Sequence, residues 1–432
     1  MPSSDYRYLR SLFSEDQIRR GLGLTVFAAT VGAVFYTQAI VFSLLFAGFV
    51  LELGVSNPIM SLMAATLPLA AAAEIVMAYL IQRTGRRREF FAGGLIASRV
   101  LWLPIVLIPY FIGAQHPDLR VVVLLGLLVA SSILLVAGGN AWGTWMGDLI
   151  PQTVLGRYFG FRQIFTVSAS IVTGILVGLY LDYHKGFGGF VTVISVLLVF
   201  GIADILVFKW VPHPPMRVRE EKHTLWEMVQ RPLRDVRYRK VMILFAILTF
   251  TTGLIVPYIG IFQRGKNYAD MSYTTGYVYG AIGGLCMIGT SYFWGRLADR
   301  WSVKKVLLIC MLIAVPPPFC YLFAAPGNTW PILLATALGN VGWAGISVVN
   351  VQLNIGLAPA RDRSMYLACQ SALMGVVTTA TFLAGGGIVK LLEGMQPIHV
   401  GRYVWGDLHV LFLISGVARV LCLIPLRTLS ER

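Results

Sequence analysis

Long apolar runs dominate the chain, and they restrict its possible folds more than any other feature. Most of them approach or exceed about 20 residues, the length that a helix needs to cross about 30 Å of hydrocarbon. They lack the strict alternation that marks the strands of a membrane β-barrel. The composition agrees, because 57% of the residues are hydrophobic and only 13% are charged. The sequence therefore predicts an all-α integral membrane protein.

Twelve membrane spans are predicted from these runs and from the polar breaks between them. They lie at roughly 22–49, 58–82, 90–112, 120–147, 162–182, 189–210, 241–262, 275–296, 304–325, 330–356, 365–390 and 408–427. The longest polar interval divides them six and six. We therefore expect an N-terminal six-helix half at 1–210, a cytoplasmic linker at 211–240 and a C-terminal six-helix half at 241–432. The polar first residues show no cleavable signal peptide.

Two internal echoes indicate that the halves are repeats of one another. The polar stretch 78–88 resembles 295–305, and both end in consecutive basic residues. A second echo relates 149–162 to 357–370. Each echo joins spans of the same order in the two halves. A parallel repeat of six helices places the binding site between the halves, near the middle of the membrane.

Lysine and arginine concentrate in alternate loops, which predicts the orientation in the membrane. Both termini and the linker are expected on the cytoplasmic side of the cell (inner) membrane. Within the linker, 224–238 is either a helix lying on anionic lipids or a solvated tether. The net charge of +15 reflects these loops, so nucleic acid is not an expected partner.

Over essentially its whole length the chain resembles the major facilitator superfamily of bacterial transporters. That family's loop between the second and third helices of a half reads Gly-x-x-x-Asp-Arg/Lys-x-Gly followed by three basic residues. The second half matches it at Gly295, Asp299, Arg300, Lys304 and Lys305. The first half keeps Arg83, Gly85, Arg86, Arg87 and Arg88 but has Ala78 and Gln82 where the family prefers Gly and Asp. The stretch 145–160 also looks like the linker that follows the fourth helix in many bacterial members.

The resemblance implies a cytoplasmic gate between the halves. Asp299 would close against the start of the fifth span, around 156–162, where a helix N-terminus and arginines stabilise an acid. Because Gln82 is uncharged, we expect an asymmetric gate in which Asp148 supplies the missing acid near Arg83 or Arg363. The predicted gate residues are Gly295, Asp299, Arg300, Lys304, Lys305, Arg83, Gly85, Arg86, Asp148, Arg157 and Arg363. The alternative is that these charges serve membrane topology alone.

Four ionisable residues fall within predicted spans, at a cost of about 2.5–3.5 kcal/mol each. Glu74 and Arg99 are expected at similar depth on adjacent helices, where they can form an ion pair. The alternative is that Glu74 carries a coupled proton. For Asp204 and Arg419, the sequence favours snorkelling or structural pairing.

By the resemblance, the first, fourth, seventh and tenth helices line the solute cavity. The predicted substrate-binding residues on them are Tyr36, Gln38, Asn140, Trp142, Tyr258, Asn340, Trp343 and Asn350, with Trp145, Gln352 and Asn354 beside them. This aromatic and amide-rich set suits a neutral, zwitterionic or amphipathic organic solute. The alternative, left open for about half of these residues, is helix packing.

The leading interpretation is a secondary transporter that works as a monomer by alternating access. A non-transporting membrane sensor or assembly factor on the same fold is the alternative. An enzyme is not expected, because no nucleophile elbow, cofactor loop or cluster of acids and histidines appears. Five cysteines without CxxC spacing and six scattered histidines predict no metal site, and no cofactor is expected.

Overall fold

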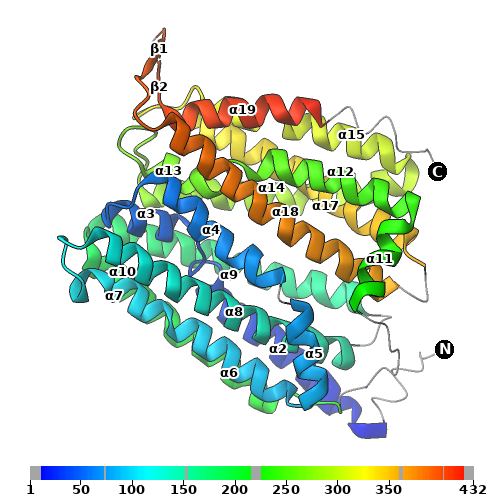
Figure 1. Cartoon of the computed structure of the whole chain (residues 1–432). Helices are drawn as coiled ribbons and strands as arrows, with labels where there is room; N and C mark the ends of the chain where they lie inside the picture. The colour runs from blue at the N-terminus through cyan, green and yellow to red at the C-terminus, as the bar shows by residue number, and fades with distance from the viewer. Residues whose placement is uncertain are drawn as a thin grey trace. The chain divides into compact units, whose positions relative to one another are not determined.

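The computed structural model describes residues 11–72, 74–150, 154–215, 225–359, 363–401 and 403–422. In these ranges the regular structure is helical apart from one short hairpin. The chain forms two compact units, Met1–Val55 with Leu69–Glu220 and Ser56–Pro68 with Glu221–Arg432, taken over their described residues. Figure 1 shows that the long helices of each unit run side by side.

The first unit is built around a bundle of long helices. Its elements are α2 (Glu15–Tyr36), α3 (Leu44–Glu52), α5 (Glu74–Thr84), α6 (Arg87–Val100), α7 (Trp102–Phe111), α8 (Pro117–Leu149), α9 (Leu155–Tyr183), α10 (Phe187–Val207) and η1 (Phe208–Trp210). Helix α6 packs along α8, and α2 packs between α9 and α10. Phe91, Trp145 and Phe208 meet in its core near the α6–α8 contact.

The second unit repeats this plan. Its elements are α11 (Leu225–Arg234), α12 (Val236–Gly253), η2 (Val256–Tyr258), α13 (Ile259–Arg264), α14 (Tyr273–Arg300), α15 (Val303–Ala314), α16 (Pro317–Tyr321), α17 (Trp330–Leu357), α18 (Arg363–Leu392), β1 (Ile398–Val400), β2 (Tyr403–Trp405) and α19 (Asp407–Leu421). Helix α17 packs along both α14 and α15, and α12 packs on α18. Strands β1 and β2 pair antiparallel in a hairpin that projects beyond the helices (Figure 1).

The all-α membrane prediction is confirmed. Nine helices in the described part of the chain are long and apolar enough to cross a membrane. The other three predicted spans correspond to α4 (Asn57–Ala72) with α5, to α14, and to α19. Helix α4 is a shorter apolar helix, α19 has 15 described residues, and α14 is diluted by Tyr, Thr and Gly. The total of twelve spans stays a prediction.

Several predicted spans are broken within the membrane. The first was expected as one run over 22–49, but α2 ends at Tyr36 and α3 begins at Leu44. The first long helix of the second unit, α12, likewise ends at Gly253 before the short η2 and α13. These breaks lie equally far before the two basic loops at 78–88 and 295–305. The repeat therefore extends from the sequence to the positions at which helices stop.

Arg419 on α19 shows how the second unit accommodates a charge within a span. The buried guanidinium donates to the carbonyl of Ala314 at 2.8 Å and to that of Thr252 at 3.5 Å. Pro318 lacks the N–H that would otherwise bond to Ala314, four residues earlier in the chain. Arg419 therefore caps carbonyls left at the C-terminal ends of α15 and α12, where the helix dipole is negative.

The first part of α4 groups with the second unit, although the predicted division at 210 assigns it to the N-terminal half. Asn57 at the start of α4 donates to the Tyr268 hydroxyl at 3.1 Å, and Tyr268 donates to Asp407 at 2.6 Å. One turn later, a Cβ atom at Gly386 of α18 would overlap the hydroxyl of Ser61. A polar triad and a glycine contact thus join 56–68 to the second unit.

Candidate functional site

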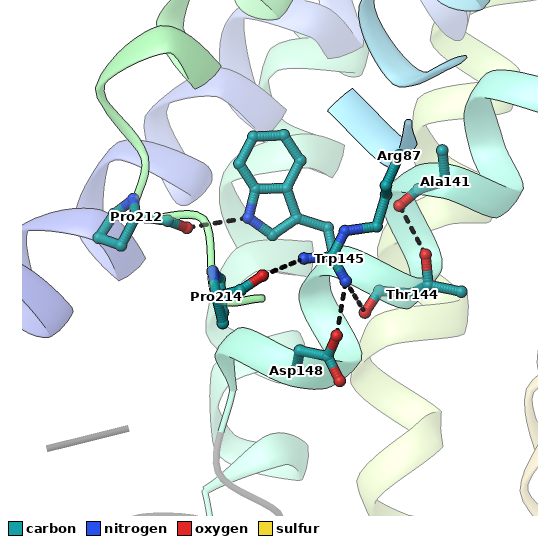
Figure 2. Close-up of polar contacts among 7 residues, drawn as sticks. All are labelled: Arg87, Ala141, Thr144, Trp145, Asp148, Pro212 and Pro214. Carbon is teal, nitrogen blue, oxygen red and sulfur yellow. Dashed lines mark hydrogen bonds and ion pairs between the residues drawn. The ribbon is translucent and has the colours of Figure 1, made fainter. Parts of the chain in front are cut away.

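Arg87 organises a polar cluster at one end of the first unit, shown in Figure 2. Its guanidinium donates to Asp148 at 2.5 Å, to the Pro214 carbonyl at 2.7 Å and to the Thr144 carbonyl at 3.4 Å. The Arg87 side chain is fully buried, whereas that of Asp148 is 22% exposed. An arginine at a helix start is unfavourable by itself, but here it faces the negative C-terminal end of α8.

Local structure explains why only one of three consecutive arginines turns inward. Gly85 has φ +66°, a conformation that favours glycine, and the chain then enters α6 at Arg87. Successive helical residues point about 100° apart, so Arg86 and Arg88 stay exposed while Arg87 enters the core. Arg86 makes a surface contact with Glu89 at 3.8 Å.

The same cluster fastens the chain that leaves the last helix of the first unit. Trp145 is buried and donates its indole N–H to the Pro212 carbonyl at 2.9 Å. The His213 ring packs edge-on against Trp145, with centroids 4.6 Å apart. Burial, helped by the nearby Arg87 and Arg88, lowers the pKa of His213, so this imidazole is neutral at pH 7. Residues 212–214 are therefore attached to α8 through Trp145 and Arg87.

In the structure, Asp148 pairs with an arginine other than the two predicted. Asp148 was expected near Arg83 or Arg363, but it pairs with Arg87 in the same unit. Arg83 is exposed and donates to the Tyr79 hydroxyl at 3.5 Å. The side chain of Arg363 lies outside the described residues. Asp148 thus joins α6 to α8, because it stands directly opposite the one arginine of the loop that points inward.

The other predicted gate residues lie at the ends of helices in their own units. Arg157 is exposed on the first turns of α9, and Arg300 is exposed at the end of α14. Ser302 caps α15 by accepting from the Lys305 backbone N–H at 3.3 Å, with Lys304 beside it and Gly295 earlier on α14. The side chain of Asp299 lies outside the described residues, so the gate itself stays a prediction.

The predicted ion pair between Glu74 and Arg99 was wrong. Glu74 is exposed on α5, whereas Arg99 is buried and pairs with Asp204 of α10. Arg99 Nη2 lies 3.1 Å from one Asp204 oxygen, and Nη1 contacts the other oxygen and the Gly201 carbonyl. A Cβ atom at Gly32 of α2 would overlap the Asp204 carboxylate, so this glycine makes room for the pair. Glu74 and Arg99 were expected at similar depth, but their side chains do not face one another.

The predicted substrate residues of the first unit fall on α2, on α8 and in the segment after α2. Tyr36 and Trp142 are half-buried, and Asn140 donates to the Glu74 carbonyl at 3.0 Å. Gln38 is buried and donates to the Ser170 carbonyl of α9 at 3.4 Å. Trp142 lies under the guanidinium of Arg162, 4.9 Å from the ring centroid. Asn140 and Trp142 are two residues apart on α8 and therefore point in different directions, Asn140 toward α5 and Trp142 toward α9.

In the second unit, much of the predicted set is engaged in helix packing. Asn354 is buried, accepts from the Tyr238 hydroxyl at 2.7 Å and donates to the Asn350 side chain at 2.6 Å. Tyr258 is fully buried, so a solute could not reach its side chain in this structure. Asn340 donates to the Thr336 carbonyl at 2.9 Å and sits against Gly283 of α14. The remaining two residues are more open: Trp343 is 36% exposed and Gln352 is half-buried.

Two arginines with notable contacts in the structure were not singled out from the sequence. Arg87 was named only as part of the family's loop motif, and Arg162 only as part of the second echo, 149–162. The signal for Arg87 was the echo itself, which aligns it with Lys304. The signal for Arg162 was its place within a stretch, Arg157–Tyr183, that is apolar enough to span a membrane.

Comparisons with known proteins agree with this architecture. The family model described as Major Facilitator Superfamily matches residues 26–291 and 280–432. A "Probable sugar efflux transporter" of Pasteurella multocida (strain Pm70) is 23% identical over 266 residues. That match covers 61% of this chain and 54% of the relative, so the chain spans about half the length of the curated relative that it matches.

Solved structures of transporters share the fold. A mutant of the nucleoside transporter NupG superposes with a TM-score of 0.71 at 11% identity, covering 95% of this chain and 99% of that chain. The inward-open xylose transporter XylE from E. coli gives a TM-score of 0.65 at 13% identity, covering 95% of each chain. The matched family and these neighbours are transporters and not enzymes. With a family model that covers nearly its whole length, the chain belongs to the Major Facilitator Superfamily, a family of membrane transporters.

Proposed function

We propose that this protein is a secondary transporter that moves a small neutral, zwitterionic or amphipathic organic solute by alternating access. The observation that carries the solute class is that Tyr36, Asn140 and Trp142 of the first unit are half-buried aromatic and amide residues. Amide and aromatic groups of this kind suit hydroxyl, amide and ring groups of a solute. The relative named as a probable sugar efflux transporter supports a small organic solute.

The proposal includes an orientation. We expect the basic loops to lie on the cytoplasmic side of the cell (inner) membrane, because positive charge is enriched on that side. Two of these loops are 83–88 and 296–305. Arg231 and Arg234 at the end of α11 would contact anionic lipids there. The protein would work as a monomer, because one chain contains both six-helix halves.

Asp299 is proposed as the acid of the cytoplasmic gate. In Asp299→Asn, loss of a charge-assisted contact should slow counterflow of radiolabelled sugars and nucleosides in proteoliposomes by about tenfold. Cytoplasmic labelling of a cysteine introduced at Gly295 should rise, because the gate opens more often. Asp118→Asn, an exposed acid at the start of α8, is the matched control. Unchanged exchange and labelling in Asp299→Asn would remove the gate from the proposal.

Proton coupling through Glu74 is the second part of the proposal. The Arg99–Asp204 pair leaves Glu74 without this arginine, and its carboxylate is exposed on a membrane helix. We expect Glu74→Gln to abolish uptake driven by a pH gradient while counterflow at equal pH keeps at least half of its rate. Both rates are measured in the same proteoliposomes. Full gradient-driven uptake in Glu74→Gln would show that the proton moves elsewhere or not at all.

A further inference from the structure

Arg162 is a charge within a stretch that is apolar enough to span a membrane, and among the described residues no acid pairs with it. It lies seven residues into α9, inside the apolar stretch Arg157–Tyr183. A cation costs about 2.5–3.5 kcal/mol at the centre of a span and less near its ends, and Arg162 lies near the start of this stretch. In the described part of the chain, no carboxylate lies within ion-pair distance of Arg162, and its guanidinium donates no hydrogen bond to the protein.

The side chain that Arg162 does contact is an aromatic ring of the candidate site. Its guanidinium carbon lies 4.9 Å from the ring centroid of Trp142 on α8. An arginine held over an indole ring has one face covered, while its N–H groups point outward from the edge of the plane. Those N–H groups form the fork that binds a carboxylate through two parallel hydrogen bonds.

The surroundings of Arg162 carry an excess of positive charge. It acts electrostatically on Tyr36 of α2 and on Asp204 of α10, so it belongs to the same polar region as the buried ion pair. In that pair Asp204 is already matched by Arg99. Arg99 is thus paired, whereas the half-buried Arg162 makes no ion pair with a described carboxylate.

We propose that Arg162, held by Trp142, binds the carboxylate of the transported solute. This narrows the solute to a zwitterionic or amphipathic molecule with a carboxylate, and it rests on the proposed function for its role in transport. A single arginine suits one monovalent carboxylate better than a phosphate dianion, which would require further cations. The aromatic rings of Trp142 and Tyr36 then contact the uncharged part of the molecule.

The test compares matched anionic and neutral probes on the purified full-length protein. The pairs are phenylacetate with phenylacetamide and gluconate with glucose, each titrated while the melting temperature is followed. In the wild type, we expect the carboxylate of at least one pair to bind about tenfold more tightly than its neutral counterpart. Arg162→Gln should lose that preference, and Arg162→Lys, which keeps the charge without the fork, should fall between them.

Two controls keep the test decisive. Arg19→Gln removes an exposed arginine of α2, whose side chain is 77% exposed, and should bind as the wild type does. Arg162→Lys retains the charge, so it reports on the site even where Arg162→Gln fails to fold. The proposal is overturned if no carboxylate stabilises the wild type, if neutral probes bind equally well, or if Arg162→Gln keeps the preference. Carboxylate binding without counterflow would instead count against the transport proposal alone.

Discussion

Replacing Asp204 by leucine should lower the free energy of unfolding by about 3–5 kcal/mol. In the wild type, Arg99 donates to the Asp204 carboxylate and to the Gly201 carbonyl. The variant leaves Arg99 buried with the Gly201 carbonyl but without the carboxylate. An uncompensated guanidinium in the interior of a membrane protein costs far more than the pair itself contributes. Thermal unfolding of the detergent-solubilised protein measures this loss, and size-exclusion chromatography of heated samples monitors it.

The double variant Arg99→Met with Asp204→Leu separates the charge from the shape of the site. Both charges are then absent and the apolar side chains fill similar volume, so stability should return to within about 1–2 kcal/mol of the wild type. An exposed pair supplies the matched control. Glu15→Ala breaks the contact with Arg19 at 3.3 Å and should change stability by less than about 1 kcal/mol. A double variant as unstable as Asp204→Leu would show that the cost is packing around Gly32 and not charge.

The sequence predicted the class of fold well because membrane spans are recorded in local composition. Apolar runs, basic loops and the paired echoes each depend on residues close together in the chain. The breaks that follow α2 and α12 are harder to predict from the sequence. Pro257 follows the second break, but Thr37 lies in an ordinary apolar run, and the interruption there is a tertiary feature. The repeat made it recognisable only when both units were compared.

The partners of charged side chains could not be predicted from the sequence. The similar depth expected for Glu74 and Arg99 comes from counting residues along two helices, and it stays a prediction. The direction in which each side chain points depends on how α6 packs between α8 and α10, which no local pattern records. Arg99 therefore faces Asp204, which is far along the chain. The same limit hid Arg162, whose significance comes from lying over Trp142.

Arg87→Met should lower the free energy of unfolding by about 3 kcal/mol, the second large effect expected in the first unit. The change removes three hydrogen bonds at once and leaves Asp148 and the Pro214 carbonyl without their donor. The loss is expected below that of Asp204→Leu, because Asp148 is 22% exposed and can be hydrated. Thermal unfolding in detergent measures this difference.

The position of the loss distinguishes Arg87 from an ordinary core residue. Because Arg87 holds Pro214 beside α8, hydrogen exchange in Arg87→Met should rise most at the amides of Val211 and His213 and in the last turn of α8. Arg86→Met is the matched control, because the side chain of Arg86 is 69% exposed. This substitution should change the free energy of unfolding by less than about 0.5 kcal/mol. Equal effects of the two substitutions would mean that Arg87 contributes only charge to the loop. A selective rise in exchange would instead establish Arg87 as the residue that fastens the start of the 211–240 segment to the first unit.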